Sequence, residues 1–201
     1  LARMAAEKTD TLALNLLGQT PDSQSGAMNR DYESFLNARN YLETDHTLLQ
    51  RVMRRWPQDP RIHLLVHAVA ADYGLLADTL DSVAQQPYPL WTLTVLAPTP
   101  CPDPAIEDVA NIEWRVAPTH RDVKRVCDTA VTENDCDIIA LLPPGSRLDP
   151  FCLWRIAHEF ATDASIGACY SDDDVSRHSD ERVEPRFKPD LINGGRGHQL
   201  K

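Results

Sequence analysis

The sequence contains no apolar run that approaches the roughly 20 residues needed by a membrane-spanning helix. It also shows no pattern typical of a secretory signal peptide. Its five cysteines are odd in number, and none belongs to a Cys-x-x-Cys pair, which argues against a disulfide framework and against a zinc site of that type. We therefore expect a chain without a membrane span, with reduced thiols, located in the cytoplasm.

Several signatures of catalysis are missing as well. No His-x-x-x-His pair lies on a predicted helix and no Gly-x-Ser-x-Gly elbow is present, which argues against a zinc hydrolase and an α/β-hydrolase. Counting twelve positions from Asp172, the sixth is Arg177 and the twelfth is Val183, so the acidic cluster there is not a calcium loop. The glycine-rich stretch 194–197 follows no predicted strand, which favours a tail over a phosphate-binding loop.

The charge balance excludes a further class. The sequence has 20 basic and 30 acidic residues, a formal net charge of −10, and no basic run rich in aromatic residues offsets this charge. Such a surface repels nucleic-acid phosphates, so we expect no nucleic-acid partner. Hydrophobic residues make up 42% of the 201 residues, which is enough to build the core of one domain with an appendage.

From residue 61 onward, short apolar runs alternate with segments of helical periodicity. The helical stripes contain Leu80, Val126 and Ile156, each with apolar neighbours three and four residues away. This alternation predicts an α/β fold with a mostly parallel sheet and helices on both faces. The most apolar run, 137–142, is expected to be central. The predicted strands are 62–69, 91–96, 112–116, 137–142 and 167–171.

Residues 1–59 are predicted to form a helical appendage and linker. A weak helix spans 9–17, a second contains Tyr32, Phe35 and Leu36, and a third follows Asp45, a residue that can cap it. The apolar face of this third helix comprises Leu48, Leu49, Val52, Met53 and Trp56. The appendage is expected to serve as a packing lid or as a contact with a partner domain or an oligomer, and the sequence leaves these alternatives open.

The most informative segment is Tyr170-Ser171-Asp172-Asp173-Asp174, followed by Glu184-Pro185-Arg186-Phe187-Lys188-Pro189-Asp190. A predicted strand here delivers three carboxylates to its carboxyl end, where open α/β sheets bind ligands. Clustered carboxylates suit a divalent cation and, through it, the diphosphate of a nucleotide. The spacing by itself favours a solvated acidic turn over a ligand site.

This segment resembles the one that follows the donor-binding half of bacterial family 2 glycosyltransferases. Three further segments resemble the same family in the same order: 61–66 its first strand, 80–91 its Leu-x-Ser-x-x-x-Gln-x-Tyr-x-x-Trp helix and turn, and 141–150 the strand and loop that carry its metal-binding motif. The resemblance covers residues 60–190 and implies the GT-A fold, a Rossmann-like nucleotide-binding fold. It also implies a nucleotide-sugar donor and a role in the synthesis of a cell-surface polysaccharide or glycan.

The chain departs from the family at three ligand-bearing loops. Where the family has its metal-binding Asp-x-Asp, this chain has Pro143, Pro144, Gly145 and Ser146, which offer no carboxylate to a hard cation. The family's Asp pair at the end of the strand 91–96 is replaced here by residues 96–100. Its Pro-x-Tyr-Asn at the end of the first strand is replaced by residues 66–69. The pattern suggests a fold that persists without its usual metal chemistry.

The family continues beyond the position of Asp190 into an acceptor-binding half that supplies a general base. Here residues 191–201 follow, without a strand pattern, and we expect an irregular tail left by truncation of the chain or of its gene. The parent protein is expected to be a hexosyltransferase, and this chain alone is expected to be inactive. The alternative is a non-catalytic interaction or regulatory module on the same fold.

Four residues are the candidates for a surviving site. Because alternate side chains of a strand point the same way, Asp172 and Asp174 are expected to converge on one Mn²⁺ or Mg²⁺ ion, or on a ribose, with Asp173 facing away. By the same argument Tyr170 would stack on the base of a nucleotide sugar, and Lys188 would pair with its phosphate. The competing hypothesis is a salt-bridged turn that fixes the segment around Phe187 against the sheet.

Overall fold

The protein is built on one parallel sheet. The computed structural model describes residues 2–5, 32, 34–36, 43–133, 135–176, 182–188 and 197–200. The sheet has the order β4-β3-β2-β5-β1-β6-β9, and all neighbouring strands in it are parallel. Its strands are β1 (Ala2–Ala5), β2 (Ile62–His67), β3 (Trp91–Ala97), β4 (Ile112–Val116), β5 (Ile138–Leu141), β6 (Ala168–Ser171) and β9 (Gly197–Leu200).

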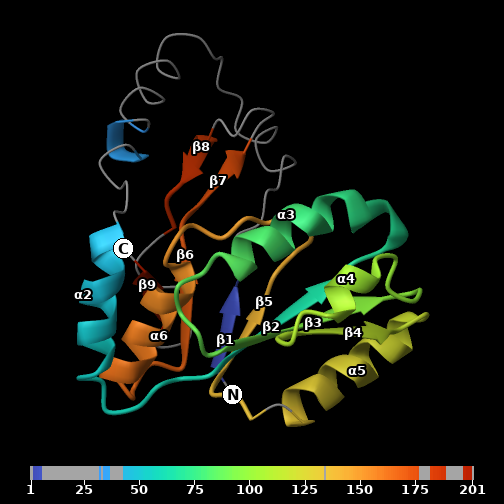
Figure 1. Ribbon diagram of the computed structural model, residues 1–201, viewed down its shortest axis with the longest axis horizontal. Coiled ribbons are helices and arrows are strands. Elements are labelled where there is room, and N and C mark those ends of the chain that lie inside the picture. The colour runs from blue at the N-terminus through green and yellow to red at the C-terminus, as the bar shows by residue number, and fades with distance from the viewer. Residues whose placement is uncertain are drawn as a thin grey trace.

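A separate antiparallel hairpin, β7 (Asp173–Ser176) and β8 (Arg182–Arg186), rises from the carboxyl end of β6 (Figure 1). The helices are α2 (Glu43–Met53), the 3₁₀ turn η2 (Ala70–Asp72), α3 (Tyr73–Ala84), α4 (Pro104–Glu107), α5 (His120–Glu133) and α6 (Cys152–Thr162). No helix among the described residues is both long and apolar enough to cross a membrane.

Helices cover both faces of the sheet, as the alternation of strands and helices predicted. Ile62, Leu64 and Val66 of β2 lie in the main core together with buried residues of α3 and α6. Leu65 and Ile139 point to the opposite face, where Cys127 of α5 packs against them. The period of two along each strand explains this division, because successive side chains of a strand leave on opposite sides.

The predicted central strand is confirmed. β5 lies fourth of the seven strands, with Ile138 paired to Ile62 of β2 and to Ala2 of β1. The other predicted strands and the helices α3, α5 and α6 also form where the sequence pattern indicated, with ends that differ by a few residues. A mostly parallel α/β fold is therefore established, and its architecture is compatible with a Rossmann-like GT-A fold.

The two ends of the chain differ from the sequence prediction. Ala2–Ala5 pairs with β5 and β6, and Gly197–Leu200 pairs with β6, although neither segment has a strand pattern. Strand pairing uses backbone N–H and C=O groups, so a segment without apolar alternation can still add to a sheet. The predicted helix at 9–17 lies outside the described residues, and the domain boundaries at 59/60 and 190/191 stay predictions.

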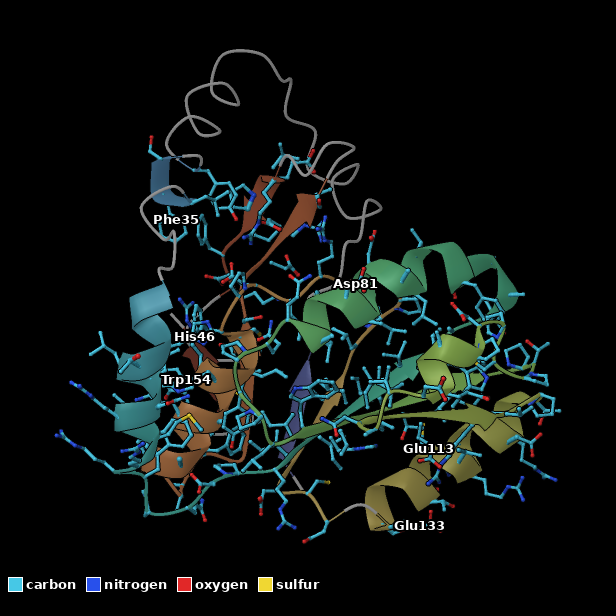
Figure 2. The ribbon with its side chains drawn as sticks, in the orientation of Figure 1. Phe35, His46, Asp81, Glu113, Glu133 and Trp154 are labelled. Atoms are coloured by element: carbon cyan, nitrogen blue, oxygen red, sulfur yellow. The ribbon has the colours of Figure 1, made fainter. Side chains whose placement is uncertain are left out.

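The third predicted helix forms as α2, which begins at Glu43, two residues before Asp45. Only part of its predicted apolar face is covered. Met53 and Trp56 pack against the core, whereas Leu48 is 55% exposed. Trp56 contacts Trp154 of α6 with ring centroids 5.6 Å apart, and Figure 2 shows His46 and Trp154 where α2 lies along α6. Aromatic packing therefore holds this helix to the domain.

A histidine is buried on the face of the sheet that α5 covers. His63 is 1% exposed, and its Nδ1 and Nε2 lie 2.7 and 3.3 Å from the hydroxyl oxygens of Thr92 and Thr94 on β3. Burial lowers the pKa of His63 from its ordinary 6.5 to about 4, and the nearby carboxylate of Glu113 only partly opposes this effect. The folded protein therefore keeps this imidazole neutral.

We predict that Ile139→Asp unfolds the domain. Ile139 is 5% exposed in the central strand, so a carboxylate there loses the burial of an aliphatic side chain and adds a buried charge, a cost of about 3 kcal/mol or more. Thermal unfolding followed by circular dichroism measures the effect. The control is Leu141→Asp in the same strand, where the side chain is 47% exposed. A soluble Ile139→Asp variant with an unchanged melting temperature would contradict the described core.

We also predict an acid-labile component of stability from His63. Its pKa is lower in the folded than in the unfolded chain, so between 6.5 and about 4 the unfolded chain binds more protons and stability falls as pH falls. The loss is on the order of 3 kcal/mol at most. Denaturant unfolding over this range should show a shallower pH dependence for His63→Gln. Identical slopes for the two proteins would show that His63 is not protected from protonation in the fold.

Candidate functional site

Polar side chains on one face of α3 hold the loop that follows β5. The N–H of Gly145 donates to Thr79 Oγ1 (2.8 Å), and the N–H of Leu148 donates to Ser82 Oγ (3.1 Å). Thr79, Ser82 and Gln86 follow one another by three and four residues, so they share a helix face that continues into the turn after α3. The helix therefore fixes the course of this loop, and we call the three residues the α3 clamp.

Gln86 is the most connected member of the α3 clamp. Its Nε2 donates to the carbonyl of Asp149 (3.0 Å), and its Oε1 accepts from the N–H of Leu153 (3.0 Å) at the start of α6. In the same motif the hydroxyl of Tyr88 donates to the carbonyl of Pro60 (2.5 Å). The residues of the Leu-x-Ser-x-x-x-Gln-x-Tyr-x-x-Trp motif thus fasten the loop and the entry to β2 by hydrogen bonds.

The first part of this loop, residues 143–146, carries no carboxylate. Gly145 has φ +85°, a left-handed conformation that favours glycine, and a Cβ built on it would lie 3.4 Å from Leu75. Ser146 is 5% exposed, and its N–H donates to the carbonyl of Pro143 (3.1 Å). Residues 143–146 form a compact turn, and a metal-free state of this turn stays a prediction.

The three aspartates after β6 contact two basic residues, Lys188 and Arg182. Asp172 Oδ1 accepts from the backbone N–H of Lys188 (2.8 Å), and the ammonium of Lys188 lies 3.2 Å from Asp173 Oδ2. The same ammonium donates to the carbonyl of Ser171 (2.5 Å). Lys188 therefore links the segment after the hairpin to the end of β6, which is the contact pattern of a salt-bridged turn.

Asp174 belongs to a different group. Its Oδ2 accepts from Arg182 Nε (2.5 Å) and from the hydroxyl of Tyr32, and Arg182 Nη1 also donates to Asp149 Oδ2 (2.9 Å). Burial and then the bond to Asp174 raise the pKa of Tyr32 above its ordinary value. Burial opposes the charge of Arg182, but its bonds to Asp149 and Asp174 raise its pKa nonetheless. We call Asp149, Arg182 and Asp174 the arginine bridge.

The expected geometry of the acidic run is therefore wrong in one respect. Asp172 accepts from the backbone N–H of Lys188, whereas Asp174 pairs with Arg182, so the two do not converge on one group. Asp173, expected to face away, pairs with the ammonium of Lys188 and has a side chain that is 7% exposed. The regular alternation fails because β6 ends at Ser171, β7 starts at Asp173, and the pairing of β7 with β8 is irregular after Asp173.

Tyr170 and Phe187 also differ from their expected positions. Tyr170 is 5% exposed, so its ring lies in the interior, and stacking on a base would require it to move outward. The Phe187 side chain is 71% exposed, although Lys188 beside it bonds to Ser171 and Asp172 at the end of β6. A role in nucleotide-sugar binding for Tyr170, Asp172, Asp174 and Lys188 stays a prediction.

Two shallow hollows flank the clamped loop. The first, about 200 Å³, is lined by Arg147, Leu148, Asp149, Pro150, Asp174, Ser176 and Arg182. The second, about 310 Å³, shares Arg147, Leu148 and Pro150 and extends along α3 past Asp81, labelled in Figure 2. Pockets for whole small molecules measure roughly 300–1,000 Å³, so the first hollow has room for one group of a ligand.

The residues at the first hollow do not fit a divalent cation. Among the described residues, Asp149 and Asp174 are its only acidic side chains, and one oxygen of each already accepts from Arg182. Within the part of the chain that the structure describes, no three His, Cys, Asp or Glu side chains are grouped to hold a metal ion. Mg²⁺ is usually held through one or two carboxylates together with water, and both carboxylates here already bind the positively charged Arg182, which a cation would have to displace.

The loops after β2 and β3 bond to each other at the same edge of the sheet. The hydroxyl oxygens of Tyr73 and Thr99 are 2.6 Å apart, and Trp114 Nε1 donates to the carbonyl of Thr99 (2.9 Å). The Tyr73 and Trp114 rings meet edge to face, 5.7 Å apart. Thr99 stands in the segment that replaces the family's Asp pair, and its polar atoms bind protein groups.

Tyr32, Asp149 and Arg182 were not predicted as site residues from the sequence; Asp149 lies within the segment 141–150 that resembles the family. The available signal was the presence of Arg182, Arg186 and Lys188 in the segment that follows the run of three aspartates. Charge complementarity of that kind predicts pairing but not the partners.

No known family profile matches this chain. It is similar to the O-antigen biosynthesis protein RfbC of Myxococcus xanthus, with 27% identity over 196 residues, which is 94% of this chain. The chain spans 15% of the length of that curated relative.

We predict that Gln86→Leu destabilises the protein by about 2–4 kcal/mol. The change removes the bonds to Asp149 and Leu153 and leaves both backbone groups without this partner, at about 1–3 kcal/mol for each buried group. Urea unfolding monitored by tryptophan fluorescence measures the difference. Gln85→Leu is the matched control, because Gln85 is exposed beside it. Equal stability of the two variants would mean that the α3 clamp does not hold the loop.

Proposed function

We propose that this chain is a glycosyltransferase-like module that takes part in the synthesis of a cell-surface polysaccharide. The observation that carries the proposal is the α3 clamp, in which Ser82 and Gln86 of the motif that resembles family 2 glycosyltransferases make specific bonds to the loop after β5. Similarity to an O-antigen biosynthesis protein over 94% of the chain supports the same proposal. The parallel sheet is compatible with a GT-A fold.

Within this proposal the ligand is a nucleotide sugar bound at the carboxyl edge of the sheet. Asp172, Asp174 and Lys188 lie at that edge, and the hollow beside Asp174 has room for a sugar ring or a phosphate. Catalysis of hexosyl transfer would require carboxylates that residues 143–146 do not supply. We therefore assign this chain to donor binding and assign transfer to other parts of a parent protein.

A second candidate is a non-catalytic interaction or regulatory module on the same fold. The specific observation in its favour is that polar groups at the ligand edge already bind one another: Tyr73 with Thr99, Asp174 with Tyr32 and Arg182, and Asp172 with Lys188. Each of these bonds has to be given up before the same atom can hold a ligand.

Calorimetric titration with uridine, guanosine and thymidine diphosphates, with and without manganese, distinguishes the two candidates. Donor binding predicts a saturable signal for one nucleotide, weakened in Asp172→Asn and Asp174→Asn and unchanged in the control Asp81→Asn. Asp174→Asn should also melt at a lower temperature, because it loses the charge that faces Arg182.

The competing outcome is equally clear. If none of the three nucleotides binds, and the two aspartate variants only melt at lower temperature, the edge serves as a structural staple and the interaction module is favoured. Binding that persists unchanged in both aspartate variants would place the nucleotide elsewhere on the chain.

A further inference from the structure

The arginine bridge places a positive charge between the two carboxylates of the first hollow. Arg182 Nε lies 2.5 Å from Asp174 Oδ2, and its Nη1 lies 2.9 Å from Asp149 Oδ2. The side chains of Asp174 and Asp149 are 9% and 20% exposed, so both ion pairs are largely shielded from water. The three residues come from three elements: the β5–α6 loop, β7 and β8.

The position of this arginine is informative because of the loop next to it. Residues 143–146 carry no carboxylate, and Asp149 is the first one after β5. Asp149 and Asp174 are thus the acidic side chains that face the hollow. A guanidinium donates from several nitrogens in one plane and can join two carboxylates at once, as a metal ion does, but it stays attached to the chain.

We propose that Arg182 takes the place of a divalent cation between Asp149 and Asp174, so that any ligand binds this site without metal. The proposal rests on the donor-binding function above, but the geometry requires only that Arg182 and a metal ion compete for the same two carboxylates. A divalent cation would meet the positive charge of Arg182 within the same small hollow. Removal of Arg182 leaves two neighbouring carboxylates, which is the start of a cation site.

Manganese alone is the probe, and its free concentration is followed by electron paramagnetic resonance. We expect wild-type protein to bind no Mn²⁺ at this site at millimolar concentration. Arg182→Gln, which keeps hydrogen-bond donors but loses the charge, should bind Mn²⁺ several-fold more tightly than wild type. Adding Asp174→Asn to this variant should abolish the gain.

Arg115→Gln is the matched control. Arg115 also joins two carboxylates, Glu113 (2.7 Å) on β4 and Glu133 (3.0 Å) on α5, at the opposite end of the sheet (Figure 2). Those carboxylates are 52% and 59% exposed, so their release should not create a Mn²⁺ site. An equal gain in Arg115→Gln would show that the effect is not specific to the arginine bridge and would overturn the proposal.

A wild-type measurement keeps the test independent of variant folding. The melting temperature of wild-type protein should not rise with Mn²⁺. A rise of several degrees that Asp174→Asn removes would mean that a metal occupies the site despite Arg182, which contradicts the proposal. Nucleotide titration with manganese and in a chelator separates the two claims. Binding in neither condition refutes donor binding and leaves the manganese result standing, whereas binding only with manganese contradicts the metal-free site.

Discussion

The α3 clamp is the constraint on which the structure at the carboxyl edge of the sheet depends. Thr79 and Gln86 are buried, and with Ser82 they satisfy backbone groups of the loop from Gly145 to Leu153. Without these partners each buried N–H or C=O would cost about 1–3 kcal/mol. The loop also contains a residue other than glycine in the left-handed region, Phe151 with φ 67°, a conformation that costs on the order of 1–3 kcal/mol. The loop tolerates that strain because the bonds on either side of Phe151 leave it no alternative path.

Ion pairs connect this loop to the β7–β8 hairpin. Asp149, held by the carbonyl bond to Gln86, pairs with Arg182 of β8, and Arg182 pairs with Asp174 of β7. A two-stranded hairpin is marginally stable by itself in water. Its attachment therefore depends on the arginine bridge and on Lys188, and both attachments use carboxylates that a ligand would otherwise need.

The sequence predicted the strands and helices that contribute apolar residues to the core. It did not predict the elements that contribute few or none. β2, β5, α3 and α6 were predicted because apolar residues repeat at the period of a strand or a helix, and burial enforces that period. The hairpin β7–β8 was missed because Asp173–Ser176 has no apolar alternation and Pro185 interrupts β8. The arginine bridge joins positions 33 residues apart, Asp149 and Arg182, and no periodicity encodes such a pair. The candidate site could therefore be located at the edge of the sheet, but the partners of its carboxylates could not be predicted.

Under the proposed function, the same division explains how a donor-binding fold can persist without carboxylates in residues 143–146. Strand and helix positions contribute through burial, which does not depend on what the loops at the carboxyl edge carry. The absence of carboxylates at Pro143, Pro144 and Gly145 does not affect the main core, since that core is formed by strands and helices on either side of the loop. The unpaired negative charge that would remain on Asp149 and Asp174 is then neutralised within the chain by Arg182. In the proposed site, this internal cation neutralises the edge without a metal ion. Whether the edge can bind a metal ion then depends on Arg182 alone.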